Sequence, residues 1–370
     1  MSYQVPTLDE LLDRARKAFR KYLRGSDAWL WPNNVVPTVK VIAGGLFEIF
    51  GFAGYIAKMI FVHTAPDIET LRKHGTEYGM PQLPARAGEG KATITSDGDI
   101  AVDVAAVFQR GDGAQYLASA AVSRTGAGTL VVPVVAAANG ASGNAEAGTP
   151  LSIVSGVTDT AGTATAEVST AVTGGADVED KERYRARLLF RKRNPPHGGA
   201  PSDYVLWASS VVGVSRVFVE RRWAGAGTIR VFVLMDDLYA NGIPPMDAVA
   251  RVADYIETVC PAGALVSVVA PTAAPIDIQI AGLTPNTIAV QEAVLASLRE
   301  GFRRLGRVAG NDVERPSMPY LAYPTSFSRS WIWQAVANAT GEERHIVNLP
   351  TADRPLFPGQ IPTLGNVTFV

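Results

Sequence analysis

Residues 175–214 read GADVEDKERYRARLLFRKRNPPHGGAPSDYVLWASSVVGV, and this stretch decides the fold at the centre of the chain. It combines a highly charged segment, a break rich in proline and glycine, and a second segment with aromatic residues. Asp177 or Asp180 can cap a helix, acidic residues lie at its positive end, and the basic residues 191–193 lie at its negative end. The charge of this stretch therefore belongs to a helix and not to a catalytic cluster.

A second helix is predicted after the break. The prolines and glycines of residues 195–199 end the first helix, and Ser202 or Asp203 is placed to cap the next one. Trp207 lies on this second helix together with Tyr204, and we expect its indole to belong to a hydrophobic core.

The order of these residues resembles that of the baseplate J-like family, the wedge proteins of contractile phage tails. The middle region of that family carries Gly-x-Asp-x-Glu, repeated Arg, Pro and Gly, then Tyr-x-x-Trp-Ala and Gly-Val. The matching residues are Gly175, Asp177, Glu179, Arg183, Arg187, Pro196, Gly199, Tyr204, Trp207, Ala208, Gly213 and Val214. Two upstream segments, residues 85–116 and 139–153, strengthen the match, so the resemblance covers roughly residues 65–235.

The resemblance implies a structural, non-enzymatic component of a baseplate wedge, in a contractile phage tail or a tail-like particle. It implies several partners: a smaller wedge protein bound through the helical N-terminal region, a second copy of the chain, neighbouring wedges, and central hub or sheath-initiating proteins. It also implies that the chain joins wedges into a ring and relays conformational change to sheath contraction. The expected location is the tail baseplate of the virion, after assembly in the cytoplasm of the host bacterium.

The overall composition is that of an ordinary soluble protein. The chain has 370 residues and a formal net charge of −1, so no global field attracts nucleic acid or an anionic membrane. Its single cysteine, Cys260, cannot form an internal disulfide, which fits assembly in a reducing cytoplasm. The spacing of Cys260 on a predicted helix indicates a small buried side chain.

The pattern along the chain predicts an α+β, multidomain protein. We expect a helical N-terminal domain at residues 1–87, a β-rich barrel or sandwich at 88–174, and α+β modules at 175–272 and 273–370. Regularly spaced valines and isoleucines favour the β-rich domain over low-complexity disorder. The two modules could be divergent copies of a ferredoxin-like unit.

The end of the chain has little helix signal. Residues 350–370 contain four prolines, which suits an extended arm lying on a neighbouring subunit, with a flexible tail as the alternative. A short strand is expected near residues 366–370.

The N-terminal region raises the question of membrane insertion. Thr7 and Glu10 form a capping box before an amphipathic helix, which argues against a signal peptide. Residues 41–62 are long and apolar enough to span a bilayer, yet they contain Glu48, Lys58 and four glycines. We therefore predict a buried helix pair and no membrane span.

Motifs for metal or cofactor chemistry are missing from the sequence. The four histidines are scattered, and we expect no catalytic residue, metal or cofactor. The strongest alternative is a metal-assisted hydrolase acting through Asp236 and Asp237, although a solvated turn is the favoured interpretation of that pair. A secreted β-rich adhesin is a further alternative, against which the lack of an export signal counts.

Two groups of residues are candidate interface positions. Arg183, Arg187 and Arg191 lie four apart, so on a helix they form one row that could meet an acidic partner or simply face solvent. Trp29 and Trp31 could lie either in a core or at an interface. No aromatic residues are interleaved with the arginine row, so nucleic-acid binding is not predicted.

Overall fold

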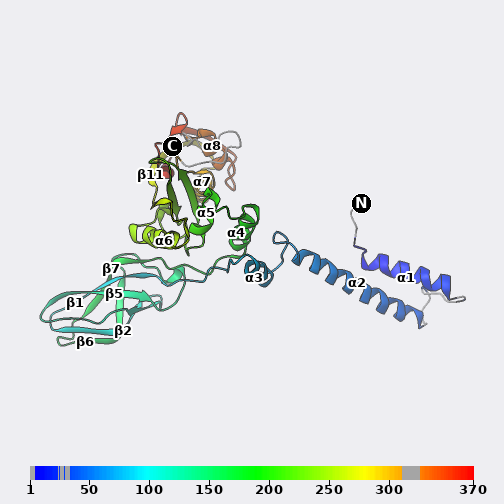
Figure 1. Ribbon diagram of the computed structural model, residues 1–370, viewed down its shortest axis with the longest axis horizontal. Helices are drawn as coiled ribbons and strands as arrows, with labels where there is room; N and C mark the ends of the chain where they lie inside the picture. The colour runs from blue at the N-terminus through cyan, green and yellow to red at the C-terminus, as the bar shows by residue number, and fades with distance from the viewer. Residues whose placement is uncertain (1–4, 24, 26–28, 30–33, 311–325) are drawn as a thin grey trace. The chain divides into compact units, whose positions relative to one another are not determined.

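The computed structural model describes residues 5–23, 25, 29, 34–310 and 326–370. This part of the chain divides into two compact units (Figure 1). One contains Met1–Pro81 and Lys181–Leu189, and the other contains Gln82–Asp180 and Phe190–Val370. The first half of the charged central helix thus belongs with the N-terminal region, although it lies 100 residues beyond that region's end in the sequence.

The first unit begins with two long helices that run side by side. Helix α1 is Leu8–Tyr22, helix α2 is Val35–Met59, and the two pack along each other. The predicted capping box is confirmed, because Glu10 N–H donates to the Thr7 side chain and Thr7 N–H donates to the Glu10 carboxylate. Helix α3, Ile68–Glu77, follows and is capped by Asp67.

The prediction of a buried helix pair at residues 41–62 is wrong. Helix α2 is one continuous helix of 25 residues, and only 11% of its most apolar window is buried. Its length and composition alone would suffice to cross a membrane. Its exposed large apolar side chains are Val41, Ile42, Leu46, Phe47, Ile49, Phe52, Tyr55 and Ile56. The four glycines did not break the helix, because each costs only about 1 kcal/mol relative to alanine.

Helix α4, Lys181–Arg193, closes the first unit. Its Tyr184 hydroxyl donates to the Met80 carbonyl at 2.8 Å, and Arg187 donates to the Pro81 carbonyl at 2.7 Å. A Cβ on Gly75 would lie 1.7 Å from the Tyr184 hydroxyl, so glycine is required for α3 to approach α4 this closely. The N-terminal half of α4 therefore fastens the segment that follows α3.

The β-rich region is a closed antiparallel barrel. Its strands are β1 (Glu89–Ser96), β2 (Ile100–Arg110), β3 (Gln115–Ala118), β4 (Val122–Arg124), β5 (Gly128–Ala136), β6 (Pro150–Asp159) and β7 (Thr165–Thr173). They are ordered β3-β5-β1-β7-β6-β2-β4, and an additional β3–β2 pairing closes a ring of six strands with β4 attached to β2. Of the two predicted types, barrel and sandwich, the structure is therefore the barrel.

Side chains that alternate along each strand between inward and outward positions fill the interior of the barrel. Ile94 of β1 is opposite Leu130 of β5, and both side chains point into the core with Phe108 and Tyr116. A long loop, residues 137–149, contains the 3-10 turn η1 (Ala141–Gly143) and joins β5 to β6. The period-two pattern of the sequence is thus the pattern of inward and outward side chains.

The middle module is a small mixed sheet with helices. It contains α5 (Pro201–Ser209), β8 (Arg216–Arg221), β9 (Thr228–Leu234), the 3-10 turn η2 (Ala240–Gly242), α6 (Met246–Val259) and β10 (Leu265–Val269). The sheet order is β10-β9-β8, with β8 antiparallel and β10 parallel to β9. The prediction that Trp207 belongs to a core is confirmed, because its ring packs edge-on against buried Tyr204.

Asp203 stabilises the break before α5 from an unexpected position. The helix begins at Pro201, so Asp203 lies in its first turn and not at the cap. Its buried carboxylate accepts hydrogen bonds from the backbone N–H groups of His197, Gly199 and Ala200. One carboxylate thereby satisfies three backbone donors of the proline and glycine turn.

The C-terminal module contains a second small mixed sheet. Its elements are β11 (Thr272–Thr284), α7 (Ile288–Leu305), β12 (Ser326–Phe327), α8 (Arg329–Ala337), β13 (Arg344–Leu349), β14 (Arg354–Pro355) and β15 (Gln360–Phe369). The larger sheet has the order β13-β11-β15, and β12 pairs with β14. A ferredoxin-like arrangement is not confirmed, because within the described residues both α+β sheets are three-stranded and contain an adjacent parallel pair.

The last residues form part of this sheet. Strand β15 pairs in parallel with β11 from Thr272 with Gln360 to Ile280 with Phe369. Residues 360–369 are therefore held by the chain's own central strand, so neither the predicted arm lying on a neighbouring subunit nor the alternative flexible tail is observed there. Ile361 of β15 and Val308 form a buried cluster with Phe232 and Leu234 of β9. The two α+β modules therefore share a core.

Candidate interaction surfaces and the Asp236 pocket

Among the described residues, α2 carries more exposed large apolar side chains than any other element. Ile49, Phe52 and Ile56 are 64%, 65% and 44% exposed, and by helix geometry they share one side. That side is turned away from the buried Val39 and Ala43. Soluble chains seldom expose such a surface, which makes this side of α2 a candidate site of association.

The arginine row of α4 is not a uniform surface. Arg183 is exposed, Arg191 is half-buried, and Arg187 is buried at 8% exposure with its guanidinium over the Tyr184 ring. Arg187 also donates to the Pro81 carbonyl, so it acts within the chain. The sequence spacing did place the three on one helix, but it could not indicate which side of that helix a distant segment covers.

Trp29 is 46% exposed, and the guanidinium groups of Arg16 and Arg20 each lie 5.9 Å from its ring centroid. Trp31 lies outside the described residues. An interface role for either tryptophan stays a prediction.

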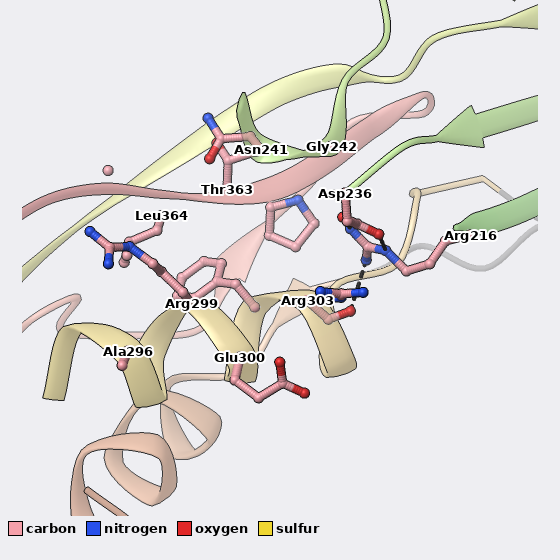
Figure 2. Close-up of a pocket in the computed structure, with 13 residues that line it drawn as sticks. Arg216, Asp236, Asn241, Gly242, Ala296, Arg299, Glu300, Arg303, Thr363 and Leu364 are labelled. Atoms are coloured by element: carbon pink, nitrogen blue, oxygen red, sulfur yellow. Dashed lines mark hydrogen bonds and ion pairs between the residues drawn. The ribbon is translucent and has the colours of Figure 1, made fainter. Parts of the chain in front are cut away.

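A pocket of about 610 Å³ adjoins the Asp236–Asp237 pair. Strand β9 ends just before Asp236, β8 carries Arg216, and α7 carries Arg303, so three elements meet there. Figure 2 shows Arg216 and Asp236 pointing toward one another beside Arg303. Arg216 donates to Asp236 from Nε at 2.8 Å and from a terminal nitrogen at 2.7 Å.

Asp236 is held as a carboxylate by these contacts. Burial by itself would raise the pKa of Asp236, but hydrogen bonds from Arg216 and Ser215 and the charges of Arg216 and Arg303 outweigh it. The net pKa of Asp236 is lowered. A carboxylate paired in this way is poorly suited to act as an acid or base near neutral pH.

Arg216 also connects the two α+β modules. Its remaining terminal nitrogen donates to the carbonyls of Arg303 and Gly306, at the C-terminal end of α7. A second ion pair joins the modules, because Arg303 of α7 lies 3.1 Å from the Asp237 carboxylate. Both carboxylates of the candidate hydrolase pair thus contact arginines, and this arrangement serves ion pairing between modules.

Groups with other chemistry are separate from this pocket. Cys260 lies at the end of α6 and packs against the middle module's core, but its side chain is half-buried and not buried as predicted. His74 contacts the Met59 carbonyl, and His345 contacts Glu342. Across the described ranges, no group of three or more His, Cys, Asp or Glu side chains could hold a metal ion.

One surface residue was not singled out by the sequence patterns. Trp223, at the turn between β8 and β9, is 41% exposed and has the Arg230 guanidinium 3.8 Å from its ring centroid. The signal was present as Arg-Arg-Trp followed by Ala-Gly-Ala-Gly, a tight turn with one large aromatic residue.

Comparison with known proteins gives matches to a baseplate family and to phage and prophage proteins, among others. Residues 196–270 match the family model described as baseplate J-like central domain. The chain is 30% identical over 392 residues to baseplate protein gp47 of Escherichia phage Mu, covering all of both chains. It is 29% identical over 381 residues to Mu-like prophage FluMu protein gp47 of Haemophilus influenzae, again covering all of both. It is 32% identical over 275 residues to the JayE protein of Escherichia coli K12, covering 74% of this chain and 96% of that protein.

Proposed function

Because the chain belongs to the baseplate J-like family, we propose that it is a structural subunit of the baseplate wedge in a contractile phage tail or tail-like particle. The observation that carries this proposal is the match over its full length to a phage Mu protein named as a baseplate protein. Its proposed location is the tail baseplate of the virion, after assembly in the cytoplasm of the host bacterium.

The helical hairpin of α1 and α2 is the proposed attachment point for wedge partners. Ile49, Phe52 and Ile56 present an apolar side that α1 leaves uncovered. Fully burying one such side chain contributes about 1.5–3 kcal/mol, so several together can offset the entropic cost of association. A helix from a smaller wedge protein, and the same hairpin from a second copy, would cover this side as in a helical bundle.

The α+β modules are the proposed connection between wedges. Their shared cluster of Phe232, Leu234, Val308 and Ile361 supports movement of the two modules as one body. A signal that repacks the contacts of such a body at its outer surface would be transmitted to its neighbours without internal deformation. We propose that relay to sheath contraction uses this rigidity.

Co-expression with the products of the neighbouring genes tests the wedge assignment. The mass of the purified complex is measured by light scattering after size-exclusion chromatography. A stable hetero-oligomer containing two copies of this chain is expected. A folded monomer that associates with none of those products would overturn the proposal.

A further inference from the structure

The turn between β8 and β9 presents a single large aromatic residue to solvent. Residues 222–227 are all exposed, and Trp223 lies among them, ahead of Gly225 and Gly227. Elsewhere in this module the aromatic rings of Tyr204, Trp207 and Phe232 are buried or packed against a core, and Tyr255 of α6 is 39% exposed. An exposed tryptophan in so small a turn adds nothing to the core of its own module.

The turn is nevertheless ordered by its own hydrogen bonds. Arg222 N–H donates to the Thr228 carbonyl at 2.7 Å, and the Thr228 hydroxyl donates to the Gly225 carbonyl at 2.7 Å. The same hydroxyl oxygen accepts from Ala224 N–H at 3.1 Å. The backbone that carries Trp223 is thus fixed before any partner arrives.

The indole itself is also fixed. The Arg230 guanidinium covers one face of the Trp223 ring at 3.8 Å, and Arg230 is in turn paired with Glu220 at 3.5 Å. Ordering a side chain at an interface usually costs about 0.5–1.5 kcal/mol of free energy. Because the Trp223 ring is already ordered in the free chain, binding would not add this cost. Pre-ordered tryptophan beside arginine is the composition typical of protein interface hot spots.

The charge around the tryptophan is one-sided. Residues 220–230 contain the three arginines Arg221, Arg222 and Arg230 against the one acidic residue Glu220. A partner surface complementary to this turn carries acidic side chains around an apolar depression. With one covered ring and no second aromatic residue in the turn, the site lacks the successive stacking platforms that single-stranded nucleic acids use.

We propose that the β8–β9 turn, residues 221–227, docks on an acidic surface of a neighbouring protein subunit of the baseplate, with Trp223 entering an apolar depression in that surface. This inference rests on the proposed baseplate function and adds a contact remote in sequence from the α1–α2 hairpin. The hairpin binds partners through apolar helix packing, and the turn binds through one aromatic anchor and a basic rim.

Thiol protection tests the contact directly. The full chain carries Ala224→Cys together with Cys260→Ser and is expressed with the other tail proteins encoded beside it. A maleimide reagent is applied to the purified chain and to purified particles, and labelling of position 224 is measured by mass spectrometry. We expect labelling in the free chain and its loss in particles, with labelling restored when the particles are dissolved in guanidinium chloride.

Outcomes of this experiment separate the two proposals. Particles that lack the chain would overturn the baseplate function itself. Particles that contain the chain but label as readily as the free chain would overturn only the docking of the turn. Protection that disappears after nuclease treatment would assign the turn to nucleic acid and would also overturn the docking proposal.

A substitution series tests the anchor. Trp223→Ala is expected to weaken retention of the chain in particles by about 30-fold or more, as for a hot-spot residue, while the hairpin complex still forms. Trp223→Phe retains part of the contact, and Arg222→Glu makes retention weaker at low salt. Met246→Ala is the matched control, since Met246 is an 82% exposed apolar residue of the same module. Equal retention of Trp223→Ala and Met246→Ala would overturn the proposal.

Discussion

The Tyr184 hydroxyl donates a hydrogen bond to the backbone carbonyl of Met80, 104 positions earlier in the chain, at 2.8 Å. Tyr184 is fully buried, and Arg185 beside it donates to the Val62 and Ala65 carbonyls at 2.7 and 2.9 Å. The first half of α4 therefore satisfies backbone acceptors of the segments on both sides of α3. The sequence distinguishes this helix by its charge, and in the structure its hydrogen bonds hold the N-terminal unit together.

Removal of the Tyr184 hydroxyl is expected to weaken the attachment of α4 to the segment that follows α3. Tyr184→Phe leaves the Met80 carbonyl without this donor in a buried place, which costs about 1–3 kcal/mol. Hydrogen–deuterium exchange of residues 181–189 measures this local stability. Tyr22→Phe is the control, because Tyr22 is 76% exposed and its change should cost less than about 0.5 kcal/mol. Unchanged exchange in Tyr184→Phe would show that the hydrogen bond does not hold α4.

A charge on the exposed side of α2 is expected to abolish partner binding without unfolding the chain. The Phe52 side chain is 65% exposed. Phe52→Asp therefore places a carboxylate that stays in water in the free chain but would be buried in a complex. Lys40→Asp on the same helix is the control, since position 40 is exposed and lies on the side opposite Ile49. Circular dichroism checks folding, and co-purification with the wedge partner gives the result. Binding retained by Phe52→Asp would refute the assigned surface.

Loss of Arg216 is expected to destabilise the second unit strongly. Arg216→Ala leaves Asp236, 9% exposed at its side chain, without its charged partner. Breaking such a buried pair costs about 3–5 kcal/mol, toward the lower end here because Arg216 is itself 20% exposed. Thermal unfolding followed by circular dichroism measures the loss. Arg251→Ala is the control, since its partner Asp247 is 68% exposed.

The same pair predicts how stability depends on pH. The folded-state pKa of Asp236 is lowered, so its contribution is present above the ordinary aspartate value of about 3.9 and is lost as the pH falls through the folded value. The melting temperature of the unaltered chain should therefore fall more steeply below pH 4 than that of Asp236→Asn. Parallel curves for the two proteins over this range would contradict the assignment.

Truncation at residue 350 is expected to disrupt folding, not merely ring assembly. It removes β15, and with it the strand that pairs in parallel with β11 and the buried side chain of Ile361. A point test uses Ile361→Asp, which should lower solubility and melting temperature, against Thr368→Asp at an exposed position of the same strand. A truncated chain that melts like the full chain but fails to complete baseplates would instead favour the arm interpretation.

Local elements were determined by the sequence itself. The Thr7 and Glu10 capping box follows from two residues three positions apart. The strand beginning at Thr228 and the helix Met246–Val259 follow from apolar residues repeated with periods of 2 and 3.6. The family was likewise recognisable from the residues of the central stretch. These features depend on neighbours within a few positions, so the order of residues is enough to predict them.

Only the tertiary structure decided which segments meet. Closure of the barrel needs β3 to pair with both β2 and β5, and α4 needs Met80 and Pro81 as acceptors. The burial of Arg187, the exposure of α2 and the pairing of Asp236 with Arg216 follow from such long-range contacts. A residue's spacing gives the side of a helix or strand on which it lies, but whether that side faces solvent, a core or a counter-charge depends on chain segments far away in the sequence.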